Sequence, residues 1–385
     1  MTPCIDRKYG IILALFLLLV QCRKEYAPPV ITAPNHFLVV DGVINSRAGS
    51  VTLININRTR NLTDSTHGGI PELGAKVAIV ANNGTSYSLQ DTSGKSGVYG
   101  STPLTLDLSR QYKLTITTAD GRRYESDFLT IKPSPVLDSV WYEEPGDLTF
   151  YVNTHDPAGD TRYYRWDYTE TWEHDARVQT PWAVKDHMIY VPDSTQQHQQ
   201  CWTTRASTDI VLGSSFRLSQ DIIHRQPVLV IPNGDARINQ KYSILIRQYA
   251  LTLEAYNYWL QVQKTSEQLG TLFDLQPSML KGNIHSLSDP GEPVIGYLGV
   301  CAVDEKRLFL YQSELLNWIH NPPEYQCDSL EIPVNQTDYR IYVYPDTNFA
   351  PWYFLSSSGP LVLISRRCVD CTLFGGTTQR PSYWK

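Results

Sequence analysis

The segment Tyr164-Arg165-Trp166-Asp167-Tyr168-Thr169 alternates large aromatic side chains with polar or charged ones. Successive side chains of a β-strand point to opposite faces of its sheet, so one face of this strand is aromatic and the other is polar. We expect the aromatic face to fill a core, with a ligand-stacking platform as the alternative. The segment therefore predicts a fold that is built on β-sheets.

The chain before this segment contains further short, alternating strands separated by turn residues. They are predicted at Phe37 to Ile44, Val51 to Ile56, Ala75 to Val80 and Tyr112 to Thr118. Asn82-Asn83-Gly84 supplies a hairpin turn, and Pro133-Ser134-Pro135 ends the series. Residues 36–134 are therefore predicted to form an immunoglobulin-like or transthyretin-like β-sandwich.

The chain after this segment is longer and denser in aromatic residues, and one helix interrupts its strands. Leu253, Tyr256 and Leu260 fall at helical spacing, which predicts a helical segment over residues 252–268 that packs on a sheet. Residues 135–385 are therefore predicted to form a second, larger β-rich domain with one inserted helical segment. The whole chain is expected to be mainly β.

The composition of the 385 residues agrees with this fold class and excludes one class of partner. Aromatic residues make up 11% of the chain, and such residues are enriched in strands. Only 19% of the residues are charged, against a typical share of roughly 25%. The formal net charge is −6, whereas proteins that bind nucleic acid usually present a basic face. No nucleic-acid partner is therefore expected.

The first 35 residues are predicted to be an export signal and a tether. A basic pair precedes an unbroken apolar run from Ile11 to Val20, which is too short to span a bilayer core of about 30 Å. Leu19-Val20-Gln21-Cys22 resembles a bacterial lipobox, in which Cys22 receives lipid chains. We predict a lipoprotein signal peptide over residues 1–21 and a proline-containing tether over residues 22–35. The alternative is an ordinary secretory signal followed by a free thiol.

Four aromatic residues lie in polar, poorly periodic sequence after the opening segment. They are Trp172, Trp182, Tyr190 and Trp202. Aromatic rings in such a stretch can stack on sugar rings or on a partner protein. We therefore treat these four as candidate ligand-binding residues, with packing in the core as the competing interpretation.

The sequence contains no familiar catalytic motif, such as a Gly-x-Ser-x-Gly elbow or a His-Glu-x-x-His zinc helix. Glu170 and Glu173 are the only acids near the aromatic residues that could form the carboxylate pair of a glycoside hydrolase. The acidic segment His155 to Asp160 lacks the regularly spaced ligands of a calcium loop and is predicted to be a turn. No catalytic residue, metal or cofactor is predicted, and we expect the protein not to be an enzyme.

Five cysteines follow the predicted lipidation site. They are Cys201, Cys301, Cys327, Cys368 and Cys371. An odd number in a compartment that permits disulfides predicts one or two structural disulfides and one unpaired thiol. We expect Cys327 to pair with Cys368 or Cys371 and so to fasten the C-terminal strand. Zinc is the less favoured alternative, because only the last two cysteines have the short spacing of zinc ligands.

Several blocks of the sequence together resemble a family of bacterial lipoproteins. They are the lipobox, Leu38 to Ile44, Glu254 to Trp259, Leu272 to Pro277, Pro293 to Tyr297, Cys368 to Cys371 and Pro381 to Trp384. In combination they are similar to the Bacteroidota lipoproteins grouped as domain of unknown function 4249. Within the first region, Ser96-Gly97-Val98-Tyr99 also resembles the transthyretin-like or carboxypeptidase-regulatory-like repeats of secreted bacterial proteins.

The resemblance implies a location and a non-enzymatic role. It implies a lipid-anchored protein of the outer membrane that faces the cell surface or the periplasm. It also implies an accessory of a TonB-dependent receptor, which captures substrate or acts as a scaffold. No catalytic or binding residue is carried over from the family. The alternatives are a stand-alone surface protein that binds glycans or peptides and, less favoured, a secreted hydrolase.

Overall fold

The fold of this chain is mainly β, as predicted, with 48% of residues in strands and 9% in helices. Residues from Phe37 to Lys385 form one compact unit. The computed structural model describes residues 36–60, 68–185, 188–193, 198–267, 281–321, 326–332, 348–356 and 360–385. The predicted signal peptide, Cys22 and the tether lie outside the described residues. No helix in the described part of the chain is both long and apolar enough to cross a membrane.

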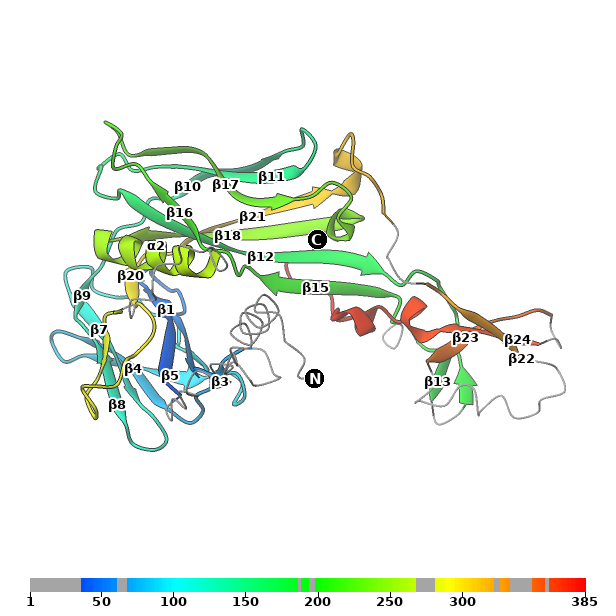
Figure 1. Ribbon diagram of the computed structural model, residues 1–385, viewed down its shortest axis with the longest axis horizontal. Coiled ribbons are helices and arrows are strands. Elements are labelled where there is room, and N and C mark those ends of the chain that lie inside the picture. Colours follow the sequence, from blue (N-terminus) through cyan, green and yellow to red (C-terminus); the bar gives the residue numbers. More distant parts are fainter. Residues whose placement is uncertain are drawn as a thin grey trace, which may run out of the picture. The chain divides into compact units, whose positions relative to one another are not determined.

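The first sheet has eleven strands, which follow the order β19-β8-β7-β4-β5-β6-β2-β1-β20, with β3 and β9 added at the side (Figure 1). These strands are β1 (Leu38–Asn45), β2 (Leu53–Arg58), β3 (Ile70–Pro71), β4 (Lys76–Ala81), β5 (Ser86–Asp91), β6 (Val98–Gly100), β7 (Gln111–Thr117), β8 (Arg123–Ser126), β9 (Leu129–Thr130), β19 (Ile284–Ser286) and β20 (Gly299–Cys301). The predicted turn at Gly84 joins β4 to β5, and its φ of +89° is a conformation that suits glycine.

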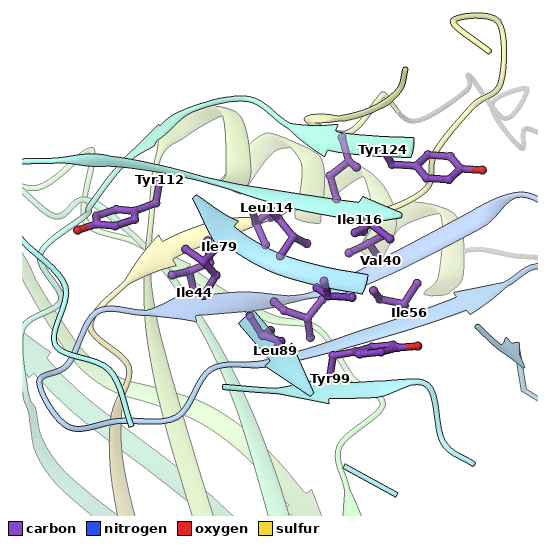
Figure 2. Close-up of a cluster of buried hydrophobic side chains, with 14 of the residues drawn as sticks. Val40, Ile44, Ile56, Ile79, Leu89, Tyr99, Tyr112, Leu114, Ile116 and Tyr124 are labelled. Atoms are coloured by element: carbon purple, nitrogen blue, oxygen red, sulfur yellow. The ribbon is translucent and has the colours of Figure 1, made fainter. Parts of the chain in front are cut away.

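Alternate side chains of this sheet point into one core. In β7, Tyr112, Leu114 and Ile116 are buried, whereas the residues between them are more exposed. Figure 2 shows Leu114 and Ile116 near Val40 of β1 and Ile56 of β2, and Tyr112 on the side of Ile44. Strands from both halves of the sheet therefore enclose the same apolar cluster, as a β-sandwich does. We call this region the sandwich.

The sandwich is completed by a segment from much later in the chain. β19 pairs with β8, and β20 pairs in parallel with β1. Ile284, Leu298 and Val300 join the apolar cluster of the sandwich. Residues 284–301 therefore belong to this core although they follow the predicted helix, and the division at residue 134 does not account for them.

The second region contains two sheets that enclose another core. One sheet has the order β10-β11-β17 and the other β15-β12-β18-β21, with β16 beside β12. The strands are β10 (Leu137–Glu143), β11 (Leu148–His155), β12 (Tyr163–Asp175), β15 (Gln200–Ala206), β16 (Val211–Ser214), β17 (Ile222–Ile231), β18 (Lys241–Leu251) and β21 (Asp304–Tyr311). Tyr164, Trp166 and Tyr168 are buried in this core together with Phe150 of β11. The expectation that the aromatic face fills a core is confirmed.

The turn between β11 and β12 is built around Asp156. Its carboxylate accepts hydrogen bonds from the main-chain amides of Ala158, Asp160 and Thr161, at 2.9–3.0 Å. Gly159 has a φ of +69° and donates to the Asp156 carbonyl. The acidic segment is therefore a strand-connecting turn, as predicted.

The helix α2 (Leu253–Glu267) lies within one residue of each predicted end. It packs against β12, β16 and β18 (Figure 1). Thr252 caps it, because its Oγ1 accepts a hydrogen bond from the amide of Ala255 at 3.2 Å. The apolar stripe differs from the predicted one: Ala255 and Tyr258 are buried, whereas Leu253 is exposed.

Smaller elements follow near the C-terminus and beside β12. They are β13 (Ala183–Lys185), β14 (Met188–Tyr190), β22 (Ser329–Ile332), β23 (Phe349–Phe354), β24 (Leu361–Ser365) and the 3₁₀ helices η1 (Ala236–Ile238), η2 (Gln312–Glu314), η4 (Arg366–Cys368) and η5 (Cys371–Phe374). β13 pairs with β14, and β24 lies between β22 and β23. We call residues 376–385, which follow η5 and its Gly375 cap, the tail.

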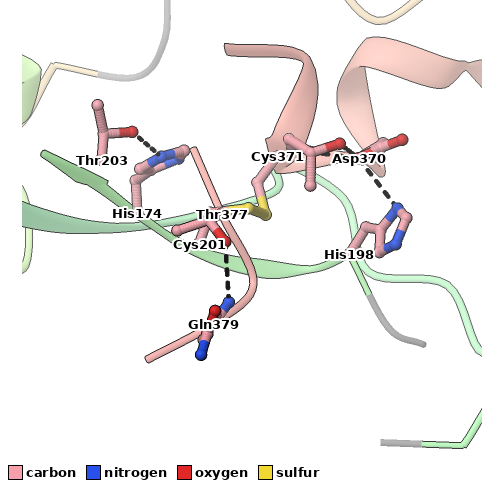
Figure 3. Close-up of a disulfide and its surroundings, with 9 residues drawn as sticks. His174, His198, Cys201, Thr203, Asp370, Cys371, Thr377 and Gln379 are labelled. Carbon is pink, nitrogen blue, oxygen red and sulfur yellow. Dashed lines mark hydrogen bonds and ion pairs between the residues drawn. A yellow bond between two sulfur atoms is a disulfide. The ribbon is translucent and has the colours of Figure 1, made fainter. Parts of the chain in front are cut away.

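Two disulfides fasten these elements, one within the C-terminal part and one to β15. Cys327 pairs with Cys368, one of the two predicted pairings, and Cys201 of β15 pairs with Cys371 (Figure 3). The two Cα–Cα distances are 5.8 and 5.9 Å, which suit a disulfide. The zinc alternative is wrong, since all four sulfur atoms are in disulfides. Cys301 is unpaired and buried, and burial raises the pKa of its thiol to about 12.

Candidate functional site

The predicted aromatic residues do not form one cluster. β12 continues to Asp175, beyond the segment that predicted it, so Trp172 lies in a strand rather than in a loop. Trp172 is opposite Thr203, and Trp202 is opposite Glu173. Directly opposed residues share a face of the sheet, so Trp172 and Trp202 point to opposite faces. Trp172 packs against the core of the second region.

The other two predicted residues lie at the small sheets β13-β14 and β22-β24-β23. The Trp182 ring meets the Phe354 ring edge to face, with 5.7 Å between their centroids. Tyr190 is in β14, opposite Ala183 of β13. Of the four predicted ligand-binding residues, therefore, only Trp202 remains at a candidate site.

That site is a groove of about 570 Å³ on the face of the sheet that carries Trp202. We call it the polar groove. Its lining residues are Glu173, Gln200, Trp202, Asn239, Gln240, Lys241, Tyr311, Gln312, Ser313, Arg380, Trp384 and Lys385. None of them is aliphatic, and amide, hydroxyl and charged groups outnumber the aromatic rings. The volume lies in the range of sites that hold small ligands.

The tail forms one wall of the polar groove. Thr377 exchanges two main-chain hydrogen bonds with Trp202, at 2.9 and 3.0 Å. Figure 3 shows this part of the tail crossing β15 beside the Cys201–Cys371 disulfide. Farther along, the indole Nε1 of Trp384 donates to the Glu173 carboxylate at 3.0 Å. The tail is therefore held at both ends of the segment that borders the groove.

Tyr383, beside Trp384, is fixed by two contacts with the same sheet. Its hydroxyl is hydrogen-bonded to Thr171 Oγ1 at 2.8 Å. The guanidinium of Arg307 lies over its ring, 3.7 Å from the centroid. These contacts place Trp384 so that its indole is only 5% exposed. Trp384 is therefore part of the groove wall rather than a free stacking platform.

Lys241 lies in an aromatic cage at the base of the groove. Its Nζ is 4.8 Å from the centroid of the Tyr311 ring, 5.2 Å from that of Phe309 and 5.3 Å from that of Trp384. The ammonium also donates to the main-chain carbonyl of Lys385. The residue is only 7% exposed. Such a desolvated cation is stabilised by the faces of aromatic rings, and its positive charge is held beside the groove.

Two buried polar atoms of the lining have no hydrogen-bond partner among the described residues. They are Nε1 of Trp202 and Oδ1 of Asn239. The Nδ2 of Asn239 donates to the carbonyl of Asn321 at 2.8 Å, which fixes the orientation of the amide. An unpaired buried polar group costs about 1–3 kcal/mol. A small shift that let a polar ligand pair with either group would recover part of that free energy.

Glu170, the other acid proposed for hydrolysis, has a structural environment. It is 1% exposed, and its carboxylate accepts hydrogen bonds from Arg237 at 2.5 Å, Tyr242 at 2.7 Å and Arg205 at 3.0 Å. Burial and the neighbouring carboxylate raise the pKa of Tyr242 well above its usual range. Glu173 points to the opposite face. The two acids therefore do not form the carboxylate pair that glycoside hydrolysis needs.

A second cleft, of about 460 Å³, lies on the same face of the sheet β15-β12-β18-β21, at its other end, where β1 and β2 form the opposite wall. Arg247 forms ion pairs there with Asp167 at 3.1 Å and Glu305 at 3.7 Å. The guanidinium of Arg165 lies over the rings of Trp259 and Tyr249, at 4.2 and 4.7 Å from their centroids. Because its charged groups largely neutralise one another, we take the polar groove as the better candidate.

Sequence reasoning missed most of the polar groove. Lys241, Tyr311, Arg380 and Trp384 were not predicted as site residues. The only available signal was the ending Pro381 to Trp384, which formed part of the family resemblance. Lys241 is the first residue of β18, and nothing in its local sequence indicates a cage of three rings from β21 and the tail.

The comparisons with known proteins identify a family and little else. Among solved structures, a DUF4785 family protein from Legionella pneumophila aligns with 16% sequence identity over 55% of this chain and 52% of that chain. The alignment thus spans about half of that protein, and its TM-score of 0.19 carries no structural argument. No curated protein matches the chain.

A family model matches a large part of the chain. The match extends over residues 23–307. It includes Glu173, Trp202 and Lys241 of the polar groove, whereas Tyr311 and the tail lie beyond it. Because the match covers well over half of the sequence, this chain belongs to the family described as domain of unknown function (DUF4249).

Proposed function

We propose that this protein is a lipid-anchored accessory of a TonB-dependent transporter in the outer membrane, where it captures substrate without catalysing a reaction. The observation that carries the capture role is the polar groove, which has hydrogen-bonding and aromatic groups but no aliphatic side chain. The anchor is supported by the lipobox that ends at Cys22, and the transporter by what the resemblance of the sequence blocks implies.

The physical advantage of this arrangement is local concentration. A binder that is tethered beside a transporter raises the effective concentration of its ligand near the pore, without needing tight affinity. A shallow polar site suits such a role, because a captured substrate must also be released. The environment of Glu170 argues against the hydrolase alternative, since this carboxylate is engaged with two arginines.

The anchor and the partner are tested together in native membranes. The full-length protein is extracted in mild detergent from cells that express TonB-dependent receptors, and co-purifying proteins are identified. We expect a β-barrel receptor to co-purify with the native chain. The Cys22→Ser variant should no longer be retained in the membrane. Cys4→Ser, within the predicted signal peptide, is the matched control and should change nothing. Purification of the anchored protein alone would contradict the transporter role and favour a stand-alone binder.

The capture role is tested at Tyr311, the exposed ring of the groove. Its side chain is 47% exposed, so Tyr311→Ala should leave the fold intact. A stacking ring contributes about 1 kcal/mol, and we expect retention of ligands from a glycan and peptide library to fall about fivefold. The matched control is Tyr353→Ala, an exposed tyrosine of β23. Equal retention by both variants would place the ligand elsewhere.

A further inference from the structure

We infer that the polar groove selects an anionic saccharide, one whose sugar rings carry carboxylate groups. This inference rests on the proposed capture function and names its ligand class. It is drawn from the charges that line the groove and from the kinds of side chain beside them.

The side-chain charges of the lining are predominantly positive. The lining contains three cationic side chains, Lys241, Arg380 and Lys385, and one carboxylate, that of Glu173. If Lys385 also carried a terminal carboxylate, the net charge of the lining would still be positive. The chain as a whole has a formal net charge of −6, so the groove is a positive site on an acidic protein. Such a site raises the local concentration of anionic ligands.

The charged groups of the lining also differ in whether they already form hydrogen bonds or ion pairs within the protein. The Glu173 carboxylate accepts hydrogen bonds from Gln200 and from Trp384, so its negative charge is partly compensated within the wall. Arg380, by contrast, is exposed and forms no ion pair with the residues that the structure describes. A guanidinium without an ion pair to the described residues can bind a carboxylate with two parallel hydrogen bonds.

The remaining lining favours a saccharide over an acidic peptide. Peptides are usually held by apolar pockets for their side chains or by pairing with the edge of a sheet. The described lining of the polar groove includes no aliphatic side chain, and its amides and hydroxyl are Gln200, Asn239, Gln240, Gln312 and Ser313. Amide groups donate and accept hydrogen bonds, as sugar hydroxyls do. The exposed ring of Tyr311 supplies a surface on which a sugar ring can stack.

The test compares two ligands that share one saccharide backbone and differ in whether their carboxyl groups are charged or methylated. Full-length protein in detergent micelles is titrated with trigalacturonic acid and with its neutral methyl ester. We expect the acid to bind at least about tenfold more tightly and its advantage to shrink at high salt, because salt screens exposed charges. Equal affinity for the two ligands would overturn the charge selection and leave the capture function standing. Binding of neither would overturn this inference, while the receptor experiment tests the proposed function separately.

Variants and a third ligand locate the effect. Arg380→Gln should weaken binding of the acid about fivefold and leave the ester unchanged, since an exposed charge contributes modestly. Lys95→Gln, an exposed cation of the sandwich with the same change in charge, is the matched control. Equal weakening by both variants would mean that net charge and not the groove attracts the ligand. Triglutamate that binds as tightly as trigalacturonic acid would contradict the saccharide class.

Discussion

The sandwich and the sheet β15-β12-β18-β21 use the same alternation of side chains in different ways. In the sandwich, one face of each strand builds a core of aliphatic and tyrosine side chains, as in β7. The second sheet packs one face on a core that includes Trp166, whereas its other face carries Glu173, Lys241 and Arg247. The polar groove and the second cleft both lie on that other face.

The difference teaches where a β-protein of this kind can hold a binding site. A face that is covered only in part, here by the tail, keeps charged groups such as Lys241 away from bulk water without placing them in an apolar core. Charges held in this way interact more strongly than charges on an open surface. High aromatic content alone does not mark the site, because many aromatic side chains, such as Tyr112 and Trp166, serve the two cores.

The largest effect is expected from the buried carboxylate of the second sheet. Glu170→Ala removes the carboxylate shared by Arg237 and Tyr242: Arg237 keeps only its second carboxylate, that of Asp235 at 2.8 Å, and the buried Tyr242 hydroxyl loses its acceptor. Removing one partner of a buried ion pair costs about 3–5 kcal/mol. Urea unfolding followed by fluorescence measures this loss, with Glu170→Gln, which retains hydrogen-bonding atoms, as the milder control. A loss below about 1 kcal/mol would mean that the network does not stabilise this sheet.

A somewhat smaller effect is expected in the sandwich. Leu114→Ala removes a fully buried side chain of β7, and such truncations cost about 3 kcal/mol because they leave a cavity. Ligand binding at the polar groove should persist under conditions where the variant is folded. If the folded variant bound the ligand more weakly than the native chain, the sandwich core would contribute to binding at the polar groove.

The tail should respond to loss of one disulfide more than to loss of the other. The double variant Cys201→Ala/Cys371→Ala removes the link between β15 and η5, at a cost of about 2 kcal/mol. We expect limited proteolysis to cleave the tail faster and groove binding to weaken. Cys327→Ala/Cys368→Ala is the control and should leave the tail protected, because its disulfide joins η4 to the segment before β22. The reverse order would contradict the assignment of the tail as a groove wall.

The smallest effect is a dependence of stability on pH through His174. Burial lowers the pKa of this imidazole below its ordinary value, although the nearby Asp175 opposes the shift. Below about pH 6.5 the unfolded chain therefore binds the proton more readily than the folded protein, and the contribution of His174 to stability falls as the pH decreases.

His174→Gln tests this dependence while keeping a polar group near Thr203, which lies 2.9 Å from His174 Nε2. The decline in the urea midpoint between pH 7.5 and pH 5 should be shallower in this variant than in the native chain. His285→Gln, at an exposed histidine of the sandwich, is the control and should keep the native decline. An unchanged slope in His174→Gln would exclude His174 as its source.

Features that depend on neighbouring residues were predictable. The alternation from Tyr164 to Tyr168 correctly predicted a buried aromatic face, and helical spacing located α2 to within one residue. The sequence also contained a local argument against the disfavoured pairing of Glu170 with Glu173. Extending the alternation by four residues shows that acids three positions apart in a strand lie on opposite faces.

Features that depend on distant residues were not predictable. β19 and β20 complete the sandwich from more than 150 residues beyond their partners β8 and β1. The two possible partners of Cys327 lie three residues apart, and their spacing in the chain could not distinguish them. Only the folded structure shows that Cys368 meets Cys327 whereas Cys371 meets Cys201.

By itself, the sequence determined the β class, the buried face of β12, the position of α2 and the family resemblance. The physical reason is that each of these is encoded by periodicity or by short blocks within a few adjacent residues. Tertiary structure alone decided the polar groove, because its charges and rings come from β12, β15, β18, β21 and the tail. These elements are separated by up to about 200 residues and meet only when the second sheet forms and the tail packs across it.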